Sequence, residues 1–99
     1  MSMDIPITLK TGFFQSEPAV MKIDNRNRQI LFVCEKGNKV FIVDFPQIMK
    51  VYYNPLANDE LTLQTIQKNY IANIEKQMLG RGIIDFFKIE FGDKFRVVQ

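Results

Sequence analysis

Five basic side chains within one stretch of the sequence are the residues best suited to binding a charged ligand. Residues 22–39 carry five basic and two acidic side chains. Arginine guanidinium groups bind phosphate through paired hydrogen bonds, and lysine supplies a point charge. This pattern predicts an anionic-ligand site formed by Lys22, Arg26, Arg28, Lys36 and Lys39. The alternative is a set of solvated turn residues that protect a strand edge from aggregation.

The side chains that most enzymes use are scarce. The chain has no histidine and a single cysteine, Cys34. Histidine is the commonest general base and zinc ligand, and one cysteine cannot build a structural zinc site. Cys34 ends the apolar run that begins at Ile30, so we interpret it as a small buried side chain. We therefore predict that the protein is not an enzyme, with no catalytic residue, no metal and no cofactor.

The basic side chains sit on an expected antiparallel meander. Residues 19–53 contain three apolar, β-branched runs separated by polar turns at 24–27 and 36–38. If these strands are neighbours, the two turns lie at opposite ends of the sheet and form two separate basic spots. Pro46 interrupts the third run, so residues 44–47 are predicted to form a bend or bulge. The flanking runs are then either consecutive strands or one broken strand.

Three further elements are expected. Alternating apolar positions predict a strand over residues 5–14. A hairpin is predicted from residue 83 to residue 97, with a turn at Gly92-Asp93. An amphipathic helix is predicted over residues 58–79, with a strand at residues 60–63 as the alternative. The apolar stripe of that helix consists of Leu63, Ile66, Tyr70, Ile71, Ile74 and Met78.

Two parts of the sequence resemble GRAM and bacterial PH-like domains. AVMKIDNRNRQILFV, at residues 19–33, is similar to the family's opening strand, polar turn and Arg-containing entry into the next strand. NKVFIVDFPQIMKVYY, at residues 38–53, resembles the following strand and the Ile-x-x-Val step, supplied by Ile48 and Val51. Gly80-Arg81-Gly82, a strand and Gly92-Asp93 are similar to the last hairpin. The resemblance covers residues 18–53 and 80–98.

The resemblance implies a fold and a ligand class. The spacing of Lys22, Arg26 and Arg28 is similar to a basic pattern that some PH domains use for inositol phosphates. Together with the strand pattern, it leads us to expect one α+β domain over residues 1–99. Its form would be a strongly bent antiparallel sheet or a small PH-like β-barrel of about six or seven strands, with one amphipathic helix near residues 58–79.

These observations predict a non-enzymatic binding or protein–protein interaction module that is able to self-associate through its sheet edges. Tyr52, Tyr53 and Tyr70 are the aromatic residues expected at an interface. The alternative is a peripheral membrane or phosphate-ligand domain that binds anionic lipid through the basic hairpin ends. Nucleic acid is not an expected partner, because the net charge is only +2. The N-terminal sequence has no signal-peptide pattern, so a cytoplasmic protein is expected.

Overall fold

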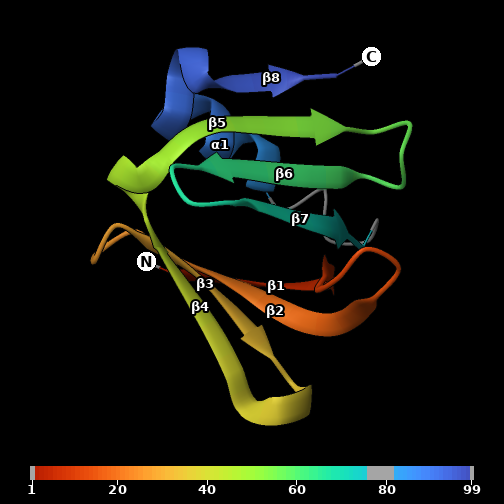
Figure 1. The fold of residues 1–99 in the computed structure, drawn as a ribbon. Helices are drawn as coiled ribbons and strands as arrows, with labels where there is room; N and C mark the ends of the chain where they lie inside the picture. Colours follow the sequence, from red (N-terminus) through yellow and green to blue (C-terminus); the bar gives the residue numbers. More distant parts are fainter. Residues whose placement is uncertain (1, 76–81, 99) are drawn as a thin grey trace.

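A single eight-stranded sheet makes up most of the computed structural model, which describes residues 2–75 and 82–98. The sheet order is β4-β3-β2-β1-β7-β6-β5-β8. One α-helix, α1, spans Ile83–Phe91 (Figure 1). The strands are β1 (Ser2–Lys10), β2 (Ser16–Asp24), β3 (Gln29–Cys34), β4 (Lys39–Asp44), β5 (Ile48–Asn54), β6 (Glu60–Thr65), β7 (Asn69–Ile74) and β8 (Phe95–Val97).

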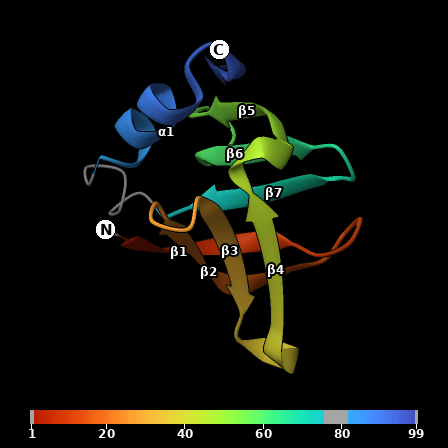
Figure 2. The ribbon, with the colours of Figure 1, turned by 90° about the vertical axis from the view of Figure 1, so that its left-hand side faces the viewer.

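The predicted fold class is wrong in several respects. The sheet has eight strands rather than six or seven, and it is mixed, because β8 runs parallel to β5. It is open rather than closed into a barrel, with β4 and β8 as its two edges. Figure 2 shows β3 and β4 crossing the direction of β5, β6 and β7 at a steep angle, with β1 and β7 joining the two groups. The inner faces of both groups share one core.

The antiparallel meander predicted over residues 19–53 is confirmed only as far as Asp44, because the segment after the bend, β5, does not pair with β4. β2 pairs antiparallel with β3, and β3 with β4, with turns at the predicted places. β1 is antiparallel to β2, but it ends at Lys10 and not at residue 14. Backbone hydrogen bonds from Thr11 N and Gly12 N to Gln15 O, 3.0 and 3.3 Å long, close a turn there. That turn removes Phe13 from the alternating pattern.

The bend predicted at residues 44–47 is confirmed as the short 3₁₀ helix η2, Phe45–Gln47. The Gln47 side chain accepts a hydrogen bond from Asp44 N at 3.1 Å, and Pro46 occupies the first turn. The runs on either side are consecutive strands, β4 and β5. They do not pair, because β4 lies at one edge of the sheet and β5 lies beside β8.

The helix predicted over residues 58–79 is wrong. The described part of this segment is the antiparallel pair β6 and β7, and residues 76–79 lie outside the described residues. The alternative strand at residues 60–63 is confirmed as part of β6. Alternation decides the outcome, because Leu61, Leu63 and Thr65 are all buried. Ile66, which the helical stripe required to be inside, is instead exposed in the turn.

The last predicted hairpin is also wrong. Residues 83–91 form α1, and β8 follows a 3₁₀ turn, η4 (Gly92–Lys94), to pair with β5 instead of with the preceding segment. Ile83, Phe87 and Phe91 are buried, and their spacing of four fits both a strand and a helix. The position of Ile89 distinguishes the helix from the strand. A strand would bury Ile89 together with Phe87, but Ile89 is 84% exposed.

Aromatic rings fix α1 against the corner of the sheet. Phe91 lies edge-on to Phe45 with ring centroids 5.4 Å apart, and Phe87 stacks near Phe95 at 6.3 Å. Phe86 completes the cluster, 6.1 Å from Phe45. The helix therefore holds both the η2 corner and β8, which neighbours β5.

We predict that Phe87→Ala lowers the free energy of unfolding by about 3–5 kcal/mol, since it leaves a cavity in this core. Ile89→Ala, two residues further on, should change it by less than about 0.5 kcal/mol because the Ile89 side chain lies in solvent. Urea denaturation of both variants measures the difference. Equal losses would contradict the helix and favour a strand.

Candidate functional site

The basic side chains predicted to form one anionic site are divided by the fold. Arg26 and Arg28 lie in the β2–β3 turn, and Lys36 and Lys39 lie around the β3–β4 turn. Consecutive antiparallel strands place these turns at opposite ends of the sheet. Lys22 is between them on the outer face of β2, 3.7 Å from the Asp4 carboxylate. The two separate spots expected from the sequence are therefore present, and no single groove joins all five side chains.

Arg28 already pairs with an acidic side chain of the helix, although its own side chain stays 62% exposed. Its Nη2 lies 2.8 Å from Glu90 Oε1 of α1, and its guanidinium carbon lies 5.1 Å from the centre of the Phe45 ring. Glu90 Oε1 is buried, so this ion pair supplies the charge that it needs. Arg28 also has a positive φ of 55°, which is uncommon outside glycine. These contacts link the β2–β3 turn to α1.

The β2–β3 turn is a local hydrogen-bonded structure. Asp24 Oδ1 accepts hydrogen bonds from Arg26 N and Asn27 N, each 3.1 Å long, and Asp24 Oδ2 accepts one from Asn27 Nδ2 at 2.8 Å. The hydrogen bonds from Asn27 lower the pKa of the Asp24 carboxyl. Arg26 is exposed on this turn beside the Asp24 carboxylate, which offsets its charge.

The opposite end of the meander contains the β3–β4 turn with its two lysines, and the β1–β2 turn. Lys36 and Lys39 are exposed, and none of the ion pairs between described residues includes either of them. The β1–β2 turn lies at the same end, because β2 begins where β3 ends. We call the residues of these two turns, 11–15 and 35–39, the hairpin end. It contains two lysines that are in no ion pair between described residues, together with the exposed Glu35, and its two turns project separately from the sheet (Figures 1 and 2).

Two adjacent phenylalanines form the tip of the hairpin end. Phe13 and Phe14 are each 93% exposed, and their rings meet edge to face with centroids 4.7 Å apart. The strand predicted over residues 5–14 would have placed Phe13 on its inner face, and neither residue was predicted to be functional. One signal was available, because two successive residues of a strand point to opposite faces and cannot both enter one core.

The predicted interface tyrosines lie in three different settings. Tyr53 packs against the core, and its hydroxyl donates a 2.7 Å hydrogen bond to Asp59 Oδ1. Burial, followed by this carboxylate, raises the pKa of Tyr53 to about 12. Tyr70 stacks on Phe32 at 5.2 Å, and burial raises its pKa. Tyr52 is half-buried on the alternate face of β5. The structure therefore does not unite these rings in one patch.

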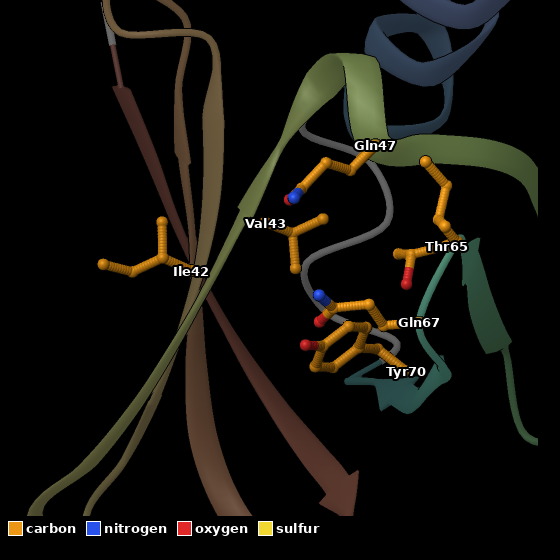
Figure 3. Close-up of a pocket in the computed structure, with 7 residues that line it drawn as sticks. Ile42, Val43, Gln47, Thr65, Gln67 and Tyr70 are labelled. Atoms are coloured by element: carbon orange, nitrogen blue, oxygen red, sulfur yellow. The ribbon is translucent and has the colours of Figure 1, made fainter.

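A small pocket of about 70 Å³ separates β4 from the β6–β7 turn (Figure 3). Val43, Gln47 and Tyr70 point into it, whereas Ile42 points to the other side of β4. A second pocket of about 160 Å³ surrounds the Arg28–Glu90 pair beside Pro46 and Lys94. Both are smaller than the roughly 300–1,000 Å³ of typical small-molecule sites.

Two kinds of feature are absent from the described residues. No helix within residues 2–75 and 82–98 is long and apolar enough to cross a membrane. No group of three or more potential metal-binding side chains occurs in the same part of the chain.

Comparison with known proteins gave no relative. No protein-family model matches this chain, and no curated protein matches it. The resemblance to GRAM and bacterial PH-like domains therefore stays a prediction from the sequence.

We predict that Tyr53→Phe destabilises the protein by about 1–3 kcal/mol at neutral pH, because Asp59 loses its buried hydrogen-bond donor. In the wild type, the phenol pKa is 10.0 when unfolded and about 12 when folded. The unfolded chain then loses its proton first, so stability falls as the pH rises from 10 towards 12. Denaturation at several alkaline pH values measures this fall. The variant should show a smaller one, and identical pH dependence would contradict the role of this bond.

Proposed function

We propose that the protein is a non-enzymatic binding module whose hairpin end docks on an anionic membrane surface. The observation that carries the proposal is the exposure of Phe13 and Phe14, 93% each, at the tip of a hairpin. Exposed apolar groups of this size in a structured turn favour an interaction site over a solvated one. Backbone hydrogen bonds between Gly12 and Gln15 hold the turn, so the rings project from a formed structure.

The shape and charge of the hairpin end suit a lipid surface. A protruding pair of rings enters a bilayer interface without a preformed cavity in the partner. Thr11, Gly12 and Gln15 carry no charge, so the tip itself presents no acidic side chain to anionic headgroups. Lys36 and Lys39 lie on the β3–β4 turn, which projects separately from the β1–β2 turn (Figures 1 and 2), and they would supply positive charge to the headgroups, offset in part by Glu35 on the same turn.

The expected interaction is weak and reversible. Burial of two phenylalanine rings contributes about 3–6 kcal/mol, and two lysines near an anionic surface add about 2 kcal/mol. Ordering and loss of rotational freedom oppose these terms. The binding should weaken as salt is added, since the lysine contribution is screened over a Debye length.

The proposal assigns anion binding to only some of the basic residues that the sequence predicted. Arg28 pairs with Glu90 and Lys22 with Asp4, so a carboxylate already offsets the charge of each. Lys36 and Lys39 take that role in the proposal. Arg26, at the opposite end of the sheet, becomes the matched control for them.

Sedimentation with vesicles of phosphatidylcholine and phosphatidylserine tests the proposal. We expect the wild type to bind at low salt, and binding to fall at least about tenfold in Phe13→Ser/Phe14→Ser, which loses the ring contribution. Lys36→Gln/Lys39→Gln should weaken binding and its salt dependence, whereas Arg26→Gln should not. Leu56→Ser is the apolar control, because Leu56 is also highly exposed but lies in the β5–β6 turn.

A fluorescence measurement locates the contact directly. The chain contains no tryptophan, so Phe14→Trp supplies a unique reporter at the tip. Its emission should shift to the blue with vesicles, and lipids brominated on the acyl chain should quench it. Wild-type protein that stays in the supernatant at low salt, or a reporter that vesicles do not affect, would overturn the proposal.

A further inference from the structure

The free edge of β4 has an unusual composition for an exposed strand. β4 ends the sheet on one side, and no described strand pairs with its outer edge (Figure 2). Its outward-facing side chains include Val40 and Ile42, which are 51% and 56% exposed. β-Branched residues on an open edge favour addition of another strand, a hazard that proteins commonly suppress with charge or proline. Neither safeguard occurs between Val40 and Val43.

The hydrogen bonds of the neighbouring residues show which backbone groups are open. Phe45 N donates to Arg28 O at 3.0 Å, so the backbone of Phe45 faces β3. Backbone directions alternate along a strand, and the groups of Asp44, Ile42 and Val40 therefore face the free edge. The Gln47 side chain already accepts the hydrogen bond of Asp44 N at 3.1 Å. Ile42 and Val40 are thus left with open donors.

We propose that a second copy of this chain pairs with this edge, β4 against β4, in an antiparallel arrangement around a two-fold axis through Phe41. In this register Val40 of each copy lies opposite Ile42 of the other. All four open donors then find carbonyl acceptors, and the Asp44–Gln47 hydrogen bond stays intact. The pairing joins the outer faces of two sheets into one continuous surface.

Other registers fit less well. An axis through Ile42 would place Val40 opposite Asp44, whose N–H group is already used by Gln47. An axis through Val40 would pair Ile42 with Asn38, which has a positive φ of 50° and belongs to the 3₁₀ turn η1 (Lys36–Asn38) rather than to an extended strand. The axis through Phe41 alone uses extended backbone and open donors on both copies.

The side chains of the same register are compatible with a second copy. The outer face gains two Val40–Ile42 pairs, and apolar β-branched pairs across strands are favourable. Lys39 lies opposite Val43, and Asp44 lies opposite Asn38, so no like charges face each other. This self-complementarity favours a copy of the chain over an unrelated strand. The two hairpin ends would then point in opposite directions, so self-association and membrane docking are separable.

Sedimentation equilibrium over a concentration series tests the pairing. We expect the mass to rise from 11.6 kDa towards twice that value as the protein is concentrated. Val40→Lys/Ile42→Lys places lysine opposite lysine and should keep the chain monomeric. Val40→Lys/Ile42→Glu places opposite charges against each other in this register and should restore the dimer. Met49→Lys, at a similarly exposed apolar position of β5, should associate as the wild type does.

Amide hydrogen exchange in the unmodified protein checks the same inference without any variant. The exchange of the Val40 and Ile42 N–H groups should slow about tenfold or more between dilute and concentrated protein, and that of Asp44 should not change. A monomer at every concentration overturns the proposal, even if an added extended peptide protects these amides. A dimer that both charge variants disrupt equally overturns the register and with it the proposed pairing.

Discussion

One shared core holds the two halves of the sheet together, and the rest of the structure depends on it. β4-β3-β2-β1 and β7-β6-β5-β8 each bury one face, and the buried side chains of both halves form a single cluster. β1 joins them by pairing with both β2 and β7. The chain also crosses from one half to the other at η2, where Phe45 packs against α1. The helix therefore stabilises the corner at which the chain passes from one half of the sheet to the other. A closed barrel would not need such a corner.

This core also determines which basic side chains are free. Arg28 lies next to the η2 corner, so its guanidinium pairs with Glu90 and lies over Phe45, although most of its side chain stays exposed. One oxygen of the partly exposed Glu90 carboxylate, Oε1, is buried, and the guanidinium supplies the opposite charge beside it. The end of the sheet remote from the corner also carries an exposed carboxylate, Glu35, but no ion pair between described residues joins it to Lys36 or Lys39. It keeps Lys36 and Lys39 unpaired among the described residues, together with the exposed Phe13 and Phe14.

The outer surface offers two different kinds of contact. The hairpin end presents two exposed aromatic rings and two lysines beside one glutamate, which we propose suits a lipid interface. The edge of β4 is extended and apolar, with open donors at Val40 and Ile42, which suits another strand. The two surfaces share the β3–β4 hairpin but use different groups of it. Lysine side chains serve the first, whereas backbone groups and β-branched side chains serve the second.

The sequence by itself determined the local elements whose signals come from neighbouring residues. Alternation and turn residues predicted β2, β3 and β4, and Pro46 predicted the corner. The amide and carboxylate side chains around residues 44–47 act within a few positions of one another, so no tertiary information was needed there. The scarcity of histidine and cysteine was equally readable.

Only the tertiary structure decided between helix and strand in the segments whose apolar spacing fits both periods. Ile83, Phe87 and Phe91 are four residues apart, and residues 60–74 satisfy both a strand pair and a helical stripe. Contact with Phe45 selected the helix for the first, and pairing with β1 and β5 selected strands for the second. The sequence likewise did not show which basic side chains form ion pairs. Glu90 lies 62 positions from Arg28, and only folding brings the two charges together.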